Sequence, residues 1–313
     1  MIKSLDLTEL SLLEKQFWFE TWREPSAIFL DIETTGLSPM ISEIIEISAL
    51  KISKSGEFLL FSSLIKPQRP ITASSELIHG ISDEMVSKSP HISEVLPKFM
   101  DFIEDAPLFG HSVSFDLAFL VYEAAKLSLS FLENKVFDTC LLARQFSREL
   151  TKNPKFKELH PSVPEIKSHK LEMLAKTFGI DHKAHRASED VMASFKITGC
   201  MLQNAPREFF HYNFLHKSYL YRVSETKQAL GMSEDTPPYQ MTSSDYQLLL
   251  GAIPNQNLIE LSYSGGSKGT AWRPVKPYAF LPGPQGSVLL AECSLTGQNK
   301  TFKLDRILKV KTH

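Results

Sequence analysis

The stretch AIFLDIETTG at residues 27–36 decides the fold, because it joins a predicted strand to a pair of acidic side chains. Asp31 and Glu33 stand at alternate positions, and side chains two residues apart on a strand point to the same side. Two carboxylates beside a core repel each other and lose hydration unless a cation lies between them. Such a pair suits Mg²⁺ or Mn²⁺, although a solvated strand end often carries the same pattern by chance.

The chain outward from this stretch alternates between strand-like and helix-like patterns. Strands are predicted at residues 27–32, 44–52, 58–65, 106–109 and 135–137. Helices are predicted at residues 92–103, 115–127, 139–146, 171–178 and 187–202. Residues 152–168 lack periodicity and predict an exposed loop, in which Lys152, Lys155, Lys157 and Lys167 either contact phosphates or are simply solvated. Strands that alternate with helices predict an α/β layered fold.

A length of 313 residues favours two domains. We predict an N-terminal helical arm at residues 1–26, with its helical spacing at 5–22, and an α/β domain at residues 27–205. A helical segment and linker follow at residues 206–245, and a small β-rich, barrel-like domain at residues 246–313. Strands in the last domain are predicted at residues 258–263, 288–293 and 301–304.

Composition excludes several classes of protein. With 42% hydrophobic and 22% charged residues the chain is neither disordered nor fibrous, and no apolar run approaches the roughly 20 residues that cross a bilayer. We therefore expect no membrane contact and a cytoplasmic location. Cys140, Cys200 and Cys293 are far apart, which argues against a disulfide framework or a zinc site. The net charge of −2 gives no signature of nucleic-acid binding for the chain as a whole.

Two further acids and a histidine stand near predicted helix starts. Asp116 opens one helix and Asp190 lies near the start of another. His185 precedes Asp190 by five residues and cannot share a helix face with it, so we expect His185 in the preceding loop, facing either a cleft or solvent. Four acids and a histidine together predict phosphodiester hydrolysis assisted by two divalent metal ions, with His185 as general base.

Three ordered motifs resemble those of the DEDDh family, the 3′-to-5′ exonucleases that include the proofreading epsilon subunit of bacterial replicative polymerase. They are DIETTG at residues 31–36, GHSVSFD at residues 110–116 and HRASED at residues 185–190. IHGI at residues 78–81 and VFDT at residues 136–139 extend the resemblance over about residues 28–202. It implies a ribonuclease-H-like fold, a mixed sheet flanked by helices. It also implies that Asp31, Glu33, Asp116 and Asp190 hold two Mg²⁺ or Mn²⁺ ions, with His185 as base.

The resemblance further implies a site for the 3′-terminal nucleotide. Its residues are Thr34, Thr35 and Gly36, and further substrate-binding residues are His111, Ser112 and Phe115. The family commonly has Asn at the position of Ser112, a change that removes no metal ligand. The expected substrate is the 3′ end of single-stranded nucleic acid, DNA in preference to RNA, with RNA trimming as the alternative because sugar choice depends on contacts with the 2′-hydroxyl. No motif identifies a polymerase or repair partner.

The C-terminal residues resemble the WYL domain, a small β module of bacterial regulators. RPVKP at residues 273–277 and TFKLDRI at residues 301–307 carry the resemblance, whereas only Leu289 remains of the Trp-Tyr-Leu triplet. The resemblance suggests Arg273 and Arg306 as contacts for nucleic acid or a nucleotide-like ligand. A second hypothesis for the whole chain is therefore a non-catalytic regulator whose nuclease fold serves only as a binding platform.

Overall fold

The computed structural model describes residues 1–4, 26–53, 57–130, 133–159, 161, 163–203, 220–222, 241–265, 270–283 and 286–313. Of the predicted arm at residues 1–26, the helical stretch at 5–22 lies outside these ranges, whereas Ile2–Ser4 form a strand. Nearly all of the predicted segment at 206–245 also lies outside them. The described residues form two compact units, which are taken separately below. The domain boundaries drawn from the sequence stay predictions.

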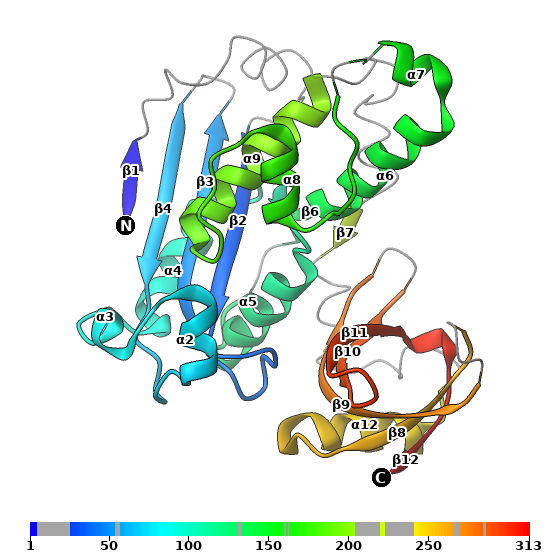
Figure 1. The fold of residues 1–313 in the computed structure, drawn as a ribbon. Helices are drawn as coiled ribbons and strands as arrows, with labels where there is room; N and C mark the ends of the chain where they lie inside the picture. The colour runs from blue at the N-terminus through cyan, green and yellow to red at the C-terminus, as the bar shows by residue number, and fades with distance from the viewer. Residues whose placement is uncertain are drawn as a thin grey trace. The chain divides into compact units, whose positions relative to one another are not determined.

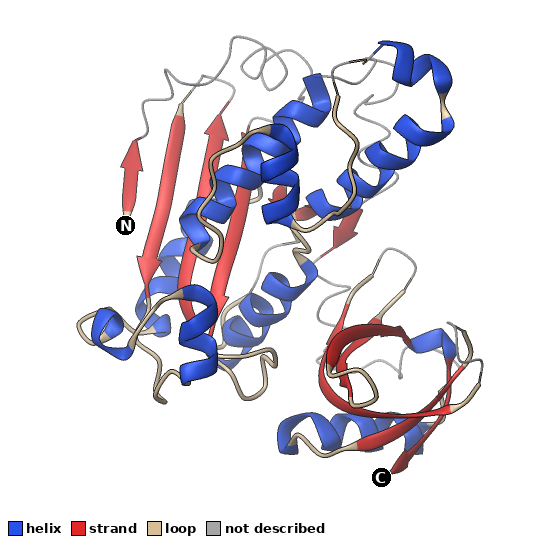
Figure 2. Cartoon of the chain, in the orientation of Figure 1, coloured by secondary structure: helices blue, strands red, loops and turns tan. Residues whose placement is uncertain are grey.

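A seven-stranded mixed sheet forms the larger unit (Figures 1 and 2), in the order β1-β4-β3-β2-β5-β6-β7. Its strands are β1 (Ile2–Ser4), β2 (Ser26–Thr34), β3 (Ile44–Ser53), β4 (Phe58–Leu64), β5 (Leu108–Gly110), β6 (Lys135–Asp138) and β7 (Leu220–Arg222). Strands β1 to β4 pair antiparallel, whereas β5 runs parallel to both β2 and β6. The sheet confirms the prediction of a mixed α/β fold, and each of the five strands predicted there is present within a few residues.

Eight described helices accompany this sheet. They are α2 (Ala73–His79), α3 (Asp83–Val86), α4 (Ile92–Ile103), α5 (Ser114–Lys126), α6 (Thr139–Lys152), α7 (Pro154–Leu159), α8 (Leu171–Phe178) and α9 (Ala187–Gln203). The bounds of α4 and α8 are those predicted. The prediction of a loop throughout residues 152–168 is wrong, because α7 occupies part of it; Pro154 suits a first helical position, where its missing N–H costs nothing.

The two faces of the larger sheet have different helical covers. On one face, Phe29 of β2 stacks on Phe109 of β5 and meets Phe195 of α9 edge to face. On the other, Phe61 of β4 contacts Phe99 of α4. Figure 1 shows α9 in front of β2 and β3 and α4 behind the sheet. Because odd-numbered residues of β2 share the face of Phe29, Asp31 and Glu33 extend toward the α9 side.

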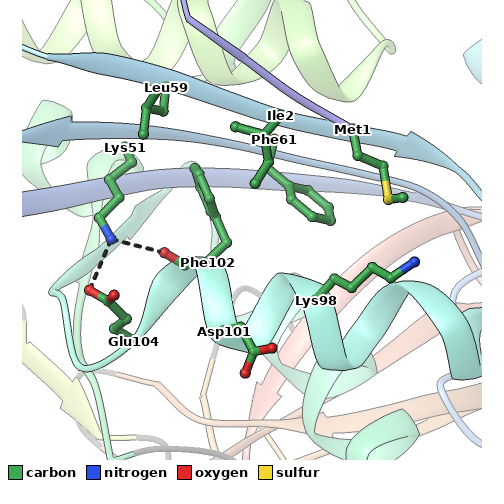
Figure 3. Close-up of a pocket in the computed structure, with 9 residues that line it drawn as sticks. All are labelled: Met1, Ile2, Lys51, Leu59, Phe61, Lys98, Asp101, Phe102 and Glu104. Carbon is green, nitrogen blue, oxygen red and sulfur yellow. Dashed lines mark hydrogen bonds and ion pairs between the residues drawn. The ribbon is translucent and has the colours of Figure 1, made fainter.

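A hollow of about 540 Å³ lies between β1, β3, β4 and α4 (Figure 3). Lys51 lies at one end of the hollow, where its Nζ donates hydrogen bonds to Glu104 Oε2 at 2.9 Å and to the carbonyl of Phe102 at 3.2 Å. These contacts hold the end of α4 against β3, and Glu104 itself has a positive φ of 49°. None of the predicted catalytic or substrate-binding residues lines this hollow.

The smaller unit contains an antiparallel five-stranded sheet in the order β11-β10-β9-β8-β12, which curls into the expected barrel-like shape (Figure 1). Its elements are α12 (Ser243–Asn255), β8 (Ile259–Tyr263), β9 (Trp272–Leu281), β10 (Val288–Cys293), β11 (Gln298–Lys303), the short 3₁₀ helix η2 (Leu304–Arg306) and β12 (Ile307–Thr312). Helix α12 was not predicted, although Leu249, Ala252 and Ile253 are buried at helical spacing and Thr242 caps its start. Strands β9 and β12 were also missed.

The described helices are all too short or too polar to traverse a lipid bilayer.

Candidate active site

Four carboxylates meet where β2 ends. Asp31 and Glu33 belong to β2 itself, whereas Asp116 lies in the first turn of α5 and Asp190 in the first turn of α9. Strand β5 pairs with β2 only at Ile28 and Phe29, so the later N–H groups on that edge of β2 have no strand partner there. Asp116 Oδ1 accepts the N–H of Ile32 at 3.0 Å. Because β5 is short, a carboxylate from α5 takes the place of a strand partner beside β2.

Burial raises the pKa of every member of this cluster, and repulsion from other acids raises it further at Asp31, Glu33 and Asp116. The pKa of Asp31 lies well above its usual value, through burial first and then through the charges of Asp116 and Asp190. Burial and the charge of Asp190 raise the pKa of Glu33 to about 8, and burial raises that of Asp116 to about 8. The pKa of Asp190 is raised by burial too. A divalent cation would relieve this repulsion, so the donor set fits hard metal ions that prefer oxygen ligands.

His185 lies in the loop before α9, as its spacing from Asp190 predicted, and its side chain is exposed. Its backbone has a left-handed φ of 67°, and its N–H donates to Asp190 Oδ2 at 3.2 Å. A side-chain atom of His185 lies within 4.8 Å of carboxylate oxygens of both Glu33 and Asp190. The structure therefore brings the predicted histidine together with two of the four predicted acids, Glu33 and Asp190.

Glu46 supports this loop and was missed by the sequence analysis. It lies opposite Glu33 in the pairing of β3 with β2, and its side chain is 2% exposed. Its oxygens accept two hydrogen bonds from Arg186, at 3.2 and 3.1 Å, and one from the N–H of Ala187 at 3.1 Å. Glu46 thus fixes the start of α9. The available signal was a single acid inside the apolar run of residues 44–50.

His182 is the second residue that the sequence analysis missed. Residues 181–186 were interpreted as a polar surface loop, yet the His182 side chain is only 3% exposed. Its Nε2 forms a short hydrogen bond with Asp190 Oδ1. Both oxygens of Asp190 therefore contact protein nitrogens, and each keeps a lone pair for another partner.

The predicted substrate residues of the first motif lie just beyond β2. The carbonyl of Thr35 accepts a hydrogen bond from Ser75 Oγ at 2.8 Å, which ties α2 to the end of this motif. Thr34 follows an irregularity in the pairing of β2 with β3. Gly36 is tightly enclosed, because a Cβ there would lie 2.7 Å from Ser42 Oγ, so a larger residue would displace Ser42. Their role in binding a nucleotide stays a prediction.

The second motif forms a turn before α5. His111 is buried enough to lower its pKa to about 4, so the neutral ring donates from Nε2 to the carbonyl of His169 at 2.9 Å. Ser112 has a φ of 62° and donates its N–H to Asp138 Oδ1 at 3.2 Å. Asn, which the related motif commonly carries, adopts this left-handed conformation more readily than Ser. Phe115 is half-buried and donates its N–H to the carbonyl of Ser112.

A cleft of about 750 Å³ lies beside this cluster. Its described lining residues are His111, Ser112, Cys140, Arg144, Lys167, Ser168, His169, Lys170, Leu171, Glu172, His182, Ala184, His185 and Asp190. The cleft thus connects residues of the second and third motifs with α6 and with the segment before α8.

Arg273 and Arg306 of the smaller unit converge on Gly265. Arg273 Nη2 donates to the carbonyl of Gly265 at 2.7 Å, and its guanidinium lies over the ring of Tyr263. A Cβ at Gly265 would lie 3.2 Å from Arg306 Nη1. The two arginines share one turn, and their predicted contact with nucleic acid or a ligand stays a prediction.

Comparisons with known proteins divide the chain in two. Residues 28–198 match the exonuclease family (RNase_T), and residues 245–312 match the WYL domain. The chain is similar to DNA polymerase III PolC-type of Caldanaerobacter subterraneus subsp. tengcongensis, with 38% identity over 182 residues. These aligned residues make up 58% of this chain. The chain is 33% identical over 193 residues to the PolC-type polymerase of Bacillus subtilis, or 61% of this chain. In each case the match spans 12% of the polymerase.

Solved structures agree on the fold. Escherichia coli exonuclease I in complex with a dT13 oligonucleotide is 17% identical, with a TM-score of 0.53. The alignment covers 85% of this chain and 55% of the exonuclease I chain. The same enzyme with a dA16 oligonucleotide gives 16% identity, 86% and 55% coverage, and a TM-score of 0.52. These likenesses confirm the ribonuclease-H-like architecture that the sequence motifs implied. With its exonuclease match spanning more than half of its residues, the chain belongs to the exonuclease family and carries a WYL domain in its C-terminal part.

Proposed function

We propose that this protein is a metal-dependent 3′-to-5′ exonuclease that hydrolyses phosphodiester bonds at the 3′ end of single-stranded nucleic acid, DNA in preference to RNA. One observation carries the proposal: four carboxylates from three distant motifs raise one another's pKa values at the end of β2, and two of them, Glu33 and Asp190, lie beside His185. The names of the relatives support it, since the matched proteins are DNA polymerases and the similar folds include an exonuclease solved with DNA oligonucleotides.

The carboxylates of Asp31, Glu33, Asp116 and Asp190 would hold two divalent ions, Mg²⁺ or Mn²⁺. When bound, such ions supply positive charge that stabilises the attacking and leaving oxygens of a displacement at phosphorus. The protein's own contribution is to hold these four carboxylates in place. Asp116 is held through the N–H of Ile32, and Asp190 through His182 and the N–H of His185.

His185 accepts a proton from the attacking water on an imidazole nitrogen. Its exposure leaves the ring reachable by water, and its place beside Glu33 and Asp190 supports this role, because a phosphate held by metal ions on those acids would lie near the ring. An imidazole suits this task because its ordinary pKa lies close to neutral pH. The hydrogen bond from the backbone of His185 to Asp190 keeps base and acid in a fixed relation.

The deciding experiment uses 5′-labelled single-stranded DNA and RNA oligonucleotides with Mg²⁺, Mn²⁺ or chelator. We expect a metal-dependent ladder that shortens from the 3′ end and is abolished by Asp31→Ala, because the variant lacks a carboxylate of the cluster. Asp181→Ala is the matched control, since Asp181 is an exposed acid outside the cluster and its loss should leave the ladder intact.

Other outcomes separate the rival functions. Faster shortening of RNA than of DNA would assign the protein to RNA trimming. Binding of either polymer without cleavage, at any metal concentration, would support the non-catalytic regulator instead. Full activity of Asp31→Ala would refute the carboxylate assignment while leaving an exonuclease.

A further inference from the structure

We propose that the 750 Å³ cleft beside the carboxylates binds the phosphate backbone of the substrate strand on the 5′ side of the scissile bond, through Arg144, Lys167 and Lys170. The inference rests on the proposed function and adds to it a set of contacts for nucleotides that are not themselves cleaved. The volume lies within the ~300–1,000 Å³ of ordinary ligand sites.

Charge is the first argument. Arg144 comes from α6, whereas Lys167 and Lys170 come from the segment before α8, so the cations belong to separate walls. The acids among the described lining residues are Glu172 and Asp190. Asp190 belongs to the proposed metal site, which leaves three cations against one acid among the remaining lining residues; Lys167 Nζ also lies 3.9 Å from Glu165 Oε2, an exposed pair that solvent weakens. A polyanion such as a nucleic-acid strand gains most from this arrangement, because its phosphates repeat along the chain.

The wall that carries the lysines is held firmly. The carbonyl of His169 accepts a hydrogen bond from His111 Nε2 at 2.9 Å and lies 3.6 Å from Cys140 Sγ. Ile166 on the same segment is buried in the main core. These contacts hold the backbone at His169 and, just before the lysines, at Ile166. A site whose cations stand on a fixed wall loses less conformational entropy when a ligand binds.

Unused polar atoms are the second argument. His169 Nε2 and His182 Nδ1, both from residues that line the cleft, are buried and have no hydrogen-bond partner among the described residues. Buried polar atoms are almost always paired, so an unpaired buried atom on a residue that lines a cleft indicates that a water or another group completes it.

Continuity with the catalytic cluster sets the direction of the strand. His185 and Asp190 belong to both the cleft and the carboxylate cluster. Thr34 and Thr35, by contrast, do not line the cleft. A 3′ end has one terminal nucleotide on one side of the scissile phosphate and the whole remaining strand on the other. The spacious, basic cleft suits the longer part, which carries the additional phosphates.

The test compares the full chain with the double variant Arg144→Ala/Lys170→Ala. KM for a ten-nucleotide DNA is measured in Mg²⁺ between 50 and 200 mM KCl. We expect KM to rise several-fold with a far smaller change in kcat, and the slope of log KM against log salt to fall by about 0.7 for each phosphate contact removed. The rise in KM should be larger for the ten-nucleotide strand than for a dinucleotide, which has no phosphate to place in the cleft.

Two controls make the result specific. Lys176→Ala removes an exposed cation of α8 outside the cleft and should leave KM and the salt slope unchanged. Arg144→Lys keeps the charge and should retain the salt slope. The proposal is overturned if the double variant behaves like Lys176→Ala. If no oligonucleotide is cleaved, the proposed function fails, and fluorescence anisotropy of the same strand over the same salt series still decides whether the cleft binds it.

Discussion

The carboxylate of Asp190 is held in its orientation by hydrogen bonds from two neighbouring residues. One of its oxygens contacts His182 Nε2 and the other accepts the N–H of His185. Both donors come from the loop that precedes α9, so the orientation of the carboxylate depends on that loop. The two histidines therefore have different expected roles: His182 positions an acid, whereas the ring of His185 faces the reaction.

Replacing His182 should weaken metal binding more than it slows the bound reaction. Loss of a residue that orients a metal ligand typically costs about 10- to 100-fold in metal affinity or activity. We expect His182→Ala to raise the Mg²⁺ concentration for half-maximal activity by that factor, with most of kcat recovered at saturating Mg²⁺. His182→Gln, which keeps an N–H donor, should lie between the variant and the parent. An unchanged Mg²⁺ requirement would reduce His182 to a packing residue.

Replacing His185 should have the opposite signature. Removal of a general base costs about 10²- to 10⁴-fold in rate, so we expect His185→Ala to lower kcat by that factor while calorimetric Mg²⁺ affinity changes little. Lys183→Ala, an exposed neighbour in the same loop, is the control. A loss of less than tenfold would contradict the base role and leave His185 as a positioning residue.

The start of α9 is the element on which the site depends most. Helix α9 packs against β2 and β3 and supplies Asp190 from its first turn. Glu46 of β3 receives three hydrogen bonds from the residues that open this helix. The strand that pairs with Glu33 thereby also determines where Asp190 lies, and a change at Glu46 should affect both stability and activity.

Glu46→Gln tests this coupling. The variant loses the charge that accepts from Arg186, whose side chain is 40% exposed and so only partly deprived of water. Hydrogen bonds to charged groups contribute about 1.5–3 kcal/mol, and we expect a loss of that order in the free energy of unfolding, measured in urea. Glu57→Gln, an exposed acid beside β4, should be neutral. A double-mutant cycle with Arg186→Met that shows no coupling energy would mean that the Glu46–Arg186 ion pair does not contribute to stability.

The whole molecule has an acidic site whose charge opposes folding at neutral pH. Glu33 and Asp116 have pKa values near 8 in the folded, metal-free protein, against roughly 4 in an unfolded chain. The folded state therefore binds more protons than the unfolded state between about pH 4 and pH 8, and stability falls as the pH rises through that window. A bound divalent cation counteracts the fall, because it stabilises the charged carboxylates.

Thermal unfolding at pH 6 and pH 8.5 measures this effect. We expect the Tm in chelator to be lower at pH 8.5, and Mg²⁺ to raise Tm more at pH 8.5 than at pH 6, since only the folded state offers the site. Glu33→Gln should reduce the difference between the two Mg²⁺ shifts. Equal Mg²⁺ shifts at both pH values would show that these carboxyl groups are not the metal ligands.

The sequence by itself determined the α/β architecture and the five residues of the proposed catalytic site. Apolar runs and helical periodicity located β2, β3, α4 and α8, because these elements bury a regular pattern of side chains that is visible in the chain. Three ordered motifs identified Asp31, Glu33, Asp116, Asp190 and His185. Helix α7 was missed because its six residues carry little signal, whereas α12 was overlooked although its apolar spacing is visible in the sequence.

Only the tertiary structure decided which other residues join the site. Glu46 lies about 140 residues from Arg186 in the chain, and no local pattern marks such a pair. His182 is polar in sequence yet buried against Asp190. Among the lysines of residues 152–168, Lys167 alone lines the cleft, where it joins Arg144 and Lys170. Strand pairing and burial between elements depend on contacts between residues that are distant in sequence. A sequence pattern therefore shows which side chains are present but not which side chains surround them in the fold.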